Sequence, residues 1–228
     1  MKNEITPIAH IKSDFSSKFG IPRQSSLIDE LEAEIIFEKE YSVPEAFRGI
    51  EGYSHIWILW QFSECADKEW SPTVRPPRLG GNKRMGVFAS RSPFRPNSIG
   101  LSCVKLISVE ETEENGVVLK VSGADLLDGT PIIDIKPYLP YVDSHPDATG
   151  GFALQEKEGS LEIVFPDELL SVIPENKQDA LRAVLKQDPR PQYQNDPERI
   201  YGLEFAGFDV RFRIVDNVLT VVEVVEIN

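Results

Sequence analysis

The segment LSCVKLISV (residues 101–109) is followed by the dipeptide Asn115-Gly116 and then by VVLKV (residues 117–121). Two stretches rich in β-branched and apolar residues around Asn-Gly are a strong signal for a β-hairpin, because both turn positions need positive φ angles. Further strands are predicted before and after this hairpin. The first part of the chain therefore has the pattern of an all-β fold that can close into a barrel.

The other predicted strands of this part are recognised by different patterns. Residues 31–38 alternate apolar residues with glutamates, which is typical of a half-buried strand. Residues 55–62 contain the longest apolar run, Ile56–Trp60, and predict a strand buried on both faces. We also expect strands near residues 5–11, over the short segment 85–89, and over the extended segment that contains Asp134 and Lys136.

The pattern changes after a polar, glycine-rich stretch at residues 142–159, which is interpreted as a linker. Beyond it, residues 161–165 predict a strand, residues 174–187 predict a helix with one apolar stripe, and residues 208–227 predict a hairpin that presents Arg211 and Arg213 on one face. We therefore expect a mainly β protein. A closed β-barrel domain would span residues 1–145, and a small α+β domain would span residues 146–228.

Positive charge is concentrated in one window of an acidic protein. The 228-residue chain has a net charge of −13, yet residues 70–109 contain seven basic and no acidic residues, which leaves −20 on the rest. Five of the seven are arginines, whose planar guanidinium suits phosphates and carboxylates. This segregation indicates a binding site for an anion. The alternative is that these arginines pair with the acidic remainder of the chain.

The sequence lacks the motifs that are typical of dinucleotide binding, of NTP hydrolysis and of zinc proteases. The chain has no glycine-rich dinucleotide fingerprint, no P-loop and no zinc-protease motif. Its two cysteines and three histidines lack metal-ligand spacing, so we expect no metal. No apolar run is long enough to cross a membrane, and the N-terminus does not resemble a signal peptide, so the cytoplasm is the expected compartment. The residues alone indicate an anion-binding or nucleic-acid-binding β protein.

Long motifs extend this interpretation. They are PRQ at 22–24, RGIExxSHIW at 48–57, WxPTVRPPRLGG at 70–81, GVFAxRSPxRPNxIG at 86–100, DGTP and DIKPY between 128 and 138, QDPRPxY at 187–193 and DVxF at 209–212. Together and in this order, they resemble the TsaA-like (TrmO) family over essentially the whole chain. The resemblance implies a β-barrel methyltransferase that uses S-adenosylmethionine, works as a homodimer, and methylates N6 of threonylcarbamoyl-adenosine beside the anticodon of tRNA.

The resemblance also implies roles for individual residues. It assigns the cofactor to two groups of positions, namely Pro22, Arg23, Gln24, Ser63 and Glu64, and then Arg91, Leu101, Leu127, Asp128, Gly129 and Thr130. Contacts to the anticodon stem-loop or to the substrate carboxylate are expected from Arg75, Arg78, Lys83, Arg84, Arg95, Lys136 and Tyr138, and from Arg190, Arg211 and Arg213 in the C-terminal part.

The expected chemistry is direct transfer from an electrophilic sulfonium, for which proximity and alignment supply most of the acceleration. The acceptor nitrogen must lose its proton, so a positioned base would help. Asp134 and Glu64 are the candidates, although Asp134 can instead pair with Lys136. Two alternatives stay open: a non-catalytic module that binds RNA or S-adenosylmethionine, and a methyltransferase of the same family that acts on a small molecule.

Overall fold

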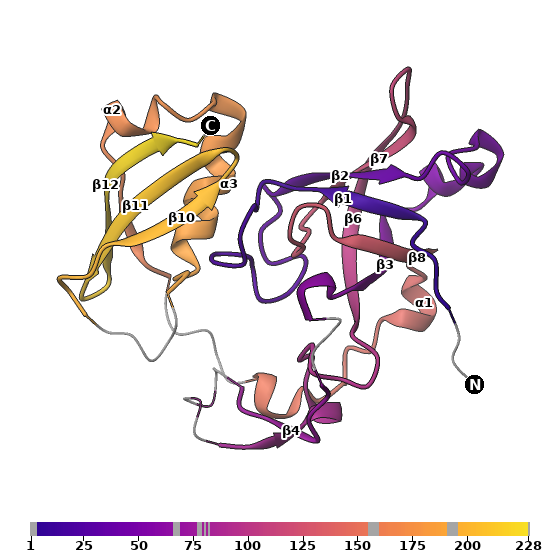
Figure 1. The fold of residues 1–228 in the computed structure, drawn as a ribbon, viewed down its shortest axis with the longest axis horizontal. Helices are drawn as coiled ribbons and strands as arrows, with labels where there is room; N and C mark the ends of the chain where they lie inside the picture. The colour runs from indigo at the N-terminus through magenta and orange to yellow at the C-terminus, as the bar shows by residue number, and fades with distance from the viewer. Residues whose placement is uncertain are drawn as a thin grey trace.

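The computed structural model describes residues 4–65, 69–76, 79, 81, 83–154, 160–190 and 196–227. Six antiparallel strands from the first part of the chain form a closed barrel in the order β1-β2-β7-β6-β3-β8. Figure 1 shows this barrel beside a second sheet from the C-terminal part. The barrel strands are β1 (Ala9–Lys12), β2 (Glu32–Phe37), β3 (His55–Gln61), β6 (Ile99–Thr112), β7 (Gly116–Ser122) and β8 (Pro131–Pro137).

Strands β6 and β7 form the hairpin that the sequence predicts. Thr112 pairs with Gly116 at its tip, and Gly116 has a φ of 64°, in the left-handed region that favours glycine. The Asn115 amide donates a hydrogen bond to Thr112 Oγ1 over 3.1 Å, which closes the turn. The predicted hairpin is therefore confirmed, but Gly116 is already paired in β7 and only the glycine, not Asn115, has a positive φ.

Strand β3 forms as predicted but is not buried on both faces. Its inward side chains Ile56, Ile58 and Trp60 are buried, whereas Trp57 on the outer face is only half-buried. On the outer face, Trp57 Nε1 donates a 3.0 Å hydrogen bond to Oδ2 of Asp143, at the end of the segment that follows β8. The expected double burial was wrong because a barrel wall has one layer, and only its inner face lies in the core.

The C-terminal part is a four-stranded sheet in the order β10-β11-β12-β9, with β9 parallel to β12. It comprises β9 (Glu162–Val164), β10 (Tyr201–Phe205), β11 (Phe208–Val215) and β12 (Val218–Glu226), with helices α2 (Asp167–Leu170) and α3 (Glu175–Lys186). Helix α3 buries Ala180, Leu181, Val184 and Leu185, which confirms the predicted apolar stripe. Among the residues described, no helix is long and apolar enough to span a membrane.

The loop between β1 and β2 packs into the core of this second sheet, and Figure 1 shows it between the two parts of the molecule. Phe15 and Ile28 are buried among the side chains of the C-terminal sheet, and the Phe15 ring meets Phe205 edge-on at 5.5 Å between centroids. An ion pair of 2.7 Å joins Asp14 Oδ2 to Lys177 Nζ. The second core therefore contains side chains from both ends of the chain.

Short elements lie around the barrel. They are the 3-10 helices η1 (Pro44–Phe47), η2 (Ile50–Gly52), η3 (Ser63–Cys65), η5 (Val87–Ala89) and η6 (Gly151–Leu154), helix α1 (Pro140–Asp143), and the strand pair β4 (Thr73–Val74) with β5 (Met85–Gly86). The expected strand at 85–89 ends at Gly86, because Val87 N–H bonds to Pro72 O and the chain then turns. The expected linker at 142–159 contains the end of α1 and η6.

Candidate functional site

A cavity of about 650 Å³ opens at one end of the barrel, and we call it the barrel-mouth cavity. Segments far apart in the sequence meet there: the loop after β1, the end of β3 with η3, the loop before β6, the start of β6, and the loop before β8. Its lining includes Lys18, Pro22, Arg23, Gln24, Trp60, Ser63, Glu64, Arg91, Arg95, Leu101, Asp125, Leu127 and Thr130.

The floor of the cavity depends on a close approach between β3 and β6. The Trp60 indole lies directly against Gly100, and a Cβ added at Gly100 would come within 2.3 Å of the Trp60 ring. Phe62 packs on Trp60 with 4.2 Å between ring centroids. Glycine at position 100 is therefore needed for the aromatic floor.

A chain of hydrogen bonds leads from this floor to a carboxylate. Trp60 Nε1 donates to Ser102 Oγ over 3.0 Å, and Ser102 Oγ donates to Asp125 Oδ1 over 2.5 Å. Burial raises the pKa of Asp125, although the hydrogen bond from Ser102 and the positive charge of Arg91 oppose this effect. The sequence predictions did not include Asp125. It lies between buried Ala124 and Leu126, so its carboxylate needs hydrogen-bond partners.

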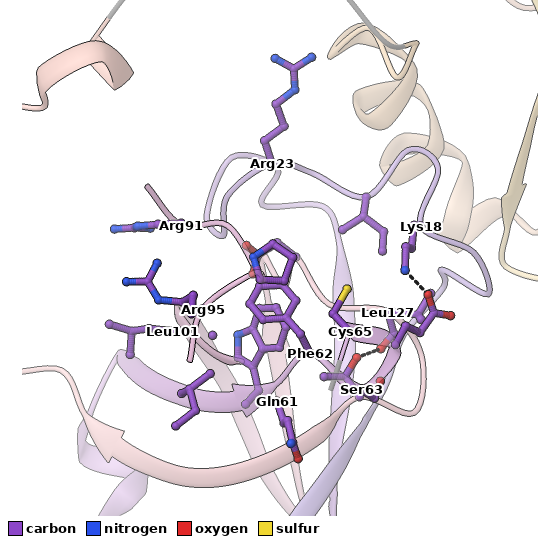
Figure 2. Close-up of a pocket in the computed structure, with 18 of the residues that line it drawn as sticks. Lys18, Arg23, Gln61, Phe62, Ser63, Cys65, Arg91, Arg95, Leu101 and Leu127 are labelled. Carbon is purple, nitrogen blue, oxygen red and sulfur yellow. Dashed lines mark hydrogen bonds and ion pairs between the residues drawn. The ribbon is translucent and has the colours of Figure 1, made fainter. Parts of the chain in front are cut away.

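Two arginines of the cavity lining, Arg91 and Arg95, donate hydrogen bonds to neutral groups. Arg91 Nη1 donates to Gln24 Oε1, and Arg95 Nη1 donates to the backbone oxygen of Ser90 over 2.7 Å. Figure 2 shows Arg91 and Arg95 on one side of the cavity and the Lys18 ammonium, joined to Glu64 by an ion pair, on the other. Such contacts fix the guanidinium groups without neutralising their charge.

A second cavity of about 890 Å³ adjoins the first, and we call it the basic cavity. Its described lining contains four arginines and no carboxylate. Arg84 Nη1 donates to Thr73 Oγ1 over 2.9 Å, so a neutral hydroxyl orients this guanidinium. The two cavities share a wall, which comprises Arg23, Gln24, Ser90, Arg91, Pro93 and Phe94.

Most of the residues expected at the cofactor lie together. Nine line the barrel-mouth cavity: Pro22, Arg23, Gln24, Ser63, Glu64, Arg91, Leu101, Leu127 and Thr130. The other two, Asp128 and Gly129, shape the adjoining turn. Asp128 Oδ1 accepts from the Ser13 amide over 2.9 Å, and Gly129 has a φ of 72°.

The residues expected to contact tRNA are divided between several places. Arg75 and Arg84 line the basic cavity, Arg95 lines the barrel-mouth cavity, and Lys83 is exposed in the same loop region. Arg78 lies outside the described residues.

The remaining tRNA candidates lie away from both cavities. Lys136 pairs with Asp134 over 2.6 Å, and Tyr138 packs beside Trp57 with 5.8 Å between ring centroids. Arg190, Arg211 and Arg213 belong to the C-terminal part, where Arg211 is in two ion pairs.

The two candidate bases occupy different surroundings. Glu64 lines the barrel-mouth cavity and pairs with Lys18, whereas Asp134 lines neither cavity and pairs with Lys136. The residues described contain no group of three or more histidine, cysteine or acidic side chains that could hold a metal ion. The lining of the barrel-mouth cavity offers arginine, amide, carboxylate and aromatic groups to a ligand.

Models of known protein families match most of the chain. The model of the tRNA-methyltransferase O N-terminal domain matches residues 10–144, and the TrmO C-terminal domain matches residues 159–227. A tRNA (adenine(37)-N6)-methyltransferase of Escherichia coli is 43% identical over 217 residues, which cover 92% of each chain. An Eikenella corrodens enzyme of the same name is 50% identical over 71% of this chain and 91% of its own.

Solved structures give the same result. A crystal structure of TrmO from Pseudomonas aeruginosa has a TM-score of 0.77 and 32% identity, and covers 99% of this chain and 100% of that one. Both family models and these relatives extend over the barrel and the C-terminal sheet. The chain therefore belongs to the tRNA-methyltransferase O (TrmO) family.

Proposed function

We propose that this protein transfers the methyl group of S-adenosylmethionine to N6 of adenine 37 in tRNA, and that the substrate base carries a threonylcarbamoyl group. The 43% identity to the E. coli tRNA (adenine(37)-N6)-methyltransferase, over nearly the full length of both chains, carries this proposal. Its cofactor is S-adenosylmethionine, since relatives of the chain are named as S-adenosylmethionine-dependent methyltransferases.

The barrel-mouth cavity fits this cofactor in size and in chemistry. Cavities that hold small ligands commonly measure a few hundred to about 1,000 Å³, and this one measures about 650 Å³. Trp60 and Phe62 offer apolar surface to a nucleoside, and Arg91 offers a guanidinium to the cofactor carboxylate. When bound, S-adenosylmethionine supplies a methyl group on an electrophilic sulfonium.

The shared wall is the proposed place of transfer. Arg91, Pro93 and Phe94 line both cavities and mark where the cavities adjoin. A cofactor in one cavity and the adenine of tRNA in the other would come into contact beside these residues. The N6 lone pair forms the new carbon–nitrogen bond, the carbon–sulfur bond breaks with its electrons on sulfur, and the N6 proton leaves to a base or to water. The protein's main contribution is alignment of the two reactants.

The basic cavity is the proposed site of the tRNA. Arg75 and Arg84 would hold backbone phosphates or the carboxylate of the threonylcarbamoyl group, since no described carboxylate in the lining competes for them. Phosphate contacts position the nucleic acid rather than specify its sequence. The −20 charge outside residues 70–109 would confine tRNA to this face. A tRNA substrate makes the cytoplasm the proposed compartment.

We also propose a homodimer, as the resemblance implies. The outer face of β6 exposes Ile99, Leu101 and Ile107, with Lys105 between the last two, and Ile99 and Leu101 also line the barrel-mouth cavity. A second copy is its proposed cover, and sedimentation equilibrium would test this. Residues 146–228 are the proposed supporting domain for tRNA or the dimer.

A gene deletion tests the reaction. Digested tRNA from the deletion strain should lack N6-methylated threonylcarbamoyl-adenosine and retain the unmethylated nucleoside, and the plasmid-borne gene should restore methylation. Normal amounts of the methylated nucleoside in the deletion strain would contradict the proposal. Methyl transfer to a metabolite extract without tRNA would favour a small-molecule acceptor instead.

A further inference from the structure

The charges around the barrel-mouth cavity leave one carboxylate to be explained. Its described lining contains the cations Lys18, Arg23, Arg91 and Arg95, and only two carboxylates, Glu64 and Asp125. Glu64 pairs with Lys18. Asp125 forms no ion pair with any described lysine, arginine or histidine, and its carboxylate accepts hydrogen bonds from the Ser102 hydroxyl and from the backbone N–H groups of Asp125 and Ser25.

The position of Asp125 is fixed by groups that are themselves buried. Ser102 is 1% exposed and Trp60 is 8% exposed. An indole N–H can only donate, so Ser102 Oγ accepts from Trp60, and the single Ser102 hydroxyl proton is then directed at Asp125 Oδ1. The chain Trp60–Ser102–Asp125 therefore presents an oriented hydrogen-bond acceptor to the cavity.

A buried carboxylate without an ion-pair partner is costly, because burial removes water from the charged form. Burial accordingly raises the pKa of Asp125, while Ser102 and the more distant charge of Arg91 favour the ionised form. A ligand that brings a positive charge next to this carboxylate would replace the lost solvation. A purely anionic ligand would make the site less favourable.

We propose that the Asp125 carboxylate binds the positive charge of the cofactor. This inference rests on the proposed function, in which S-adenosylmethionine occupies the barrel-mouth cavity. The cofactor carries an anionic carboxylate and two cationic groups, the ammonium and the sulfonium. A cavity that offered only arginines would suit the carboxylate and repel both cations. Asp125 supplies the opposite charge, and Ser102 is a positioning residue that orients it.

Comparing the binding of the cofactor with that of the reaction product shows which of the two cationic groups Asp125 contacts. S-adenosylhomocysteine keeps the ammonium but has a neutral thioether in place of the sulfonium. If Asp125 faces the sulfonium, its loss weakens binding of S-adenosylmethionine more than binding of the product. If it faces the ammonium, both lose affinity equally. In the first case Asp125 would also favour release of the product after methyl transfer.

The test is isothermal titration of both ligands into the wild type, Asp125→Asn and a matched control. Asp147→Asn removes the same charge from an exposed position outside both cavities. We expect Asp125→Asn to weaken S-adenosylmethionine binding by about ten- to a hundredfold, the usual range for a hydrogen bond to a charged group. The control should bind both ligands as the wild type does.

Two results would overturn the inference. Unchanged affinity of Asp125→Asn for both ligands would exclude the charge contact, and a loss of turnover at unchanged affinity would assign Asp125 to proton transfer instead. A wild type that binds neither ligand would contradict the proposed function itself. If Asp125→Asn does not fold by circular dichroism, Ser102→Ala provides the test: it keeps the carboxylate, removes its orienting bond, and should weaken binding about threefold or more.

Discussion

Three arginines of the two cavities differ from two arginines of the C-terminal part in what they contact. Arg84, Arg91 and Arg95 donate to a threonine hydroxyl, a glutamine side chain and backbone carbonyls. Arg211, in contrast, reaches Asp209 over 2.9 Å and Glu223 over 2.7 Å, and Arg190 reaches Asp188 over 3.0 Å.

This difference separates a binding role from a structural one. A neutral partner orients a guanidinium and leaves its charge available to a ligand, whereas a carboxylate both orients the guanidinium and neutralises its charge. The segregation of basic residues in the sequence therefore matters because it keeps carboxylates out of the described lining of the basic cavity. Mutations in the two groups should have unequal effects.

The largest effect is expected for Arg91→Ala. Arg91 lies in the wall that both cavities share and is held by Gln24. Loss of its charge-assisted contact should weaken S-adenosylmethionine binding by about ten- to a hundredfold, measured by calorimetry. Arg48→Ala, at an exposed arginine outside both cavities, is the control and should bind the cofactor normally. Equal affinity in the two variants would remove Arg91 from the cofactor site.

A smaller and different effect is expected for Arg75→Ala combined with Arg84→Ala. Both residues line the basic cavity but not the barrel-mouth cavity. The KM for tRNA should rise about tenfold, and the salt dependence of tRNA binding should decrease by about one unit of slope for each lost phosphate contact. Cofactor affinity should stay within about twofold of the wild type. A variant that lost cofactor binding and kept its tRNA KM would reverse our assignment of the two cavities.

The smallest effects are expected on β11. Arg211 is in ion pairs, whereas Arg213, exposed on the same face, has none with a described carboxylate. Arg213→Ala should therefore raise the KM for tRNA by about twofold, and Arg211→Ala by less, since a neutralised guanidinium has little to offer a phosphate. A greater loss for Arg211→Ala would show that its ion pairs open when tRNA binds.

Local patterns predicted much of the fold. The hairpin β6–β7, strand β2 and helix α3 follow from the Asn-Gly turn, from period-two alternation and from an apolar stripe. Strand β10 had no comparable signal, since Gly202 interrupts its apolar pattern. A Cβ at this position would lie 2.8 Å from Asp209 Oδ1 on the neighbouring strand β11.

The parts that were not predicted depend on contacts between distant segments. Phe15 and Ile28 lie in the loop between β1 and β2, and they are buried because the C-terminal sheet packs on them. The network of Trp60, Ser102 and Asp125 joins β3, β6 and the segment after β7, which the pairing of these three neighbouring strands brings together. The motif resemblance named the cofactor candidates, and the structure shows that most of them line one cavity. Asp125 could be found only from burial and hydrogen bonding.

Mass spectrometry of anticodon-loop nucleosides tests the central claim most directly. Hypomodified tRNA that carries threonylcarbamoyl-adenosine at position 37 would be incubated with the purified protein and S-adenosylmethionine, then digested. We predict a new nucleoside heavier by one methyl group, with the methyl on N6, in wild-type reactions and strongly reduced amounts with Arg91→Ala. Binding of both cofactor and tRNA without any methylated nucleoside would contradict the account and indicate a non-catalytic binding protein.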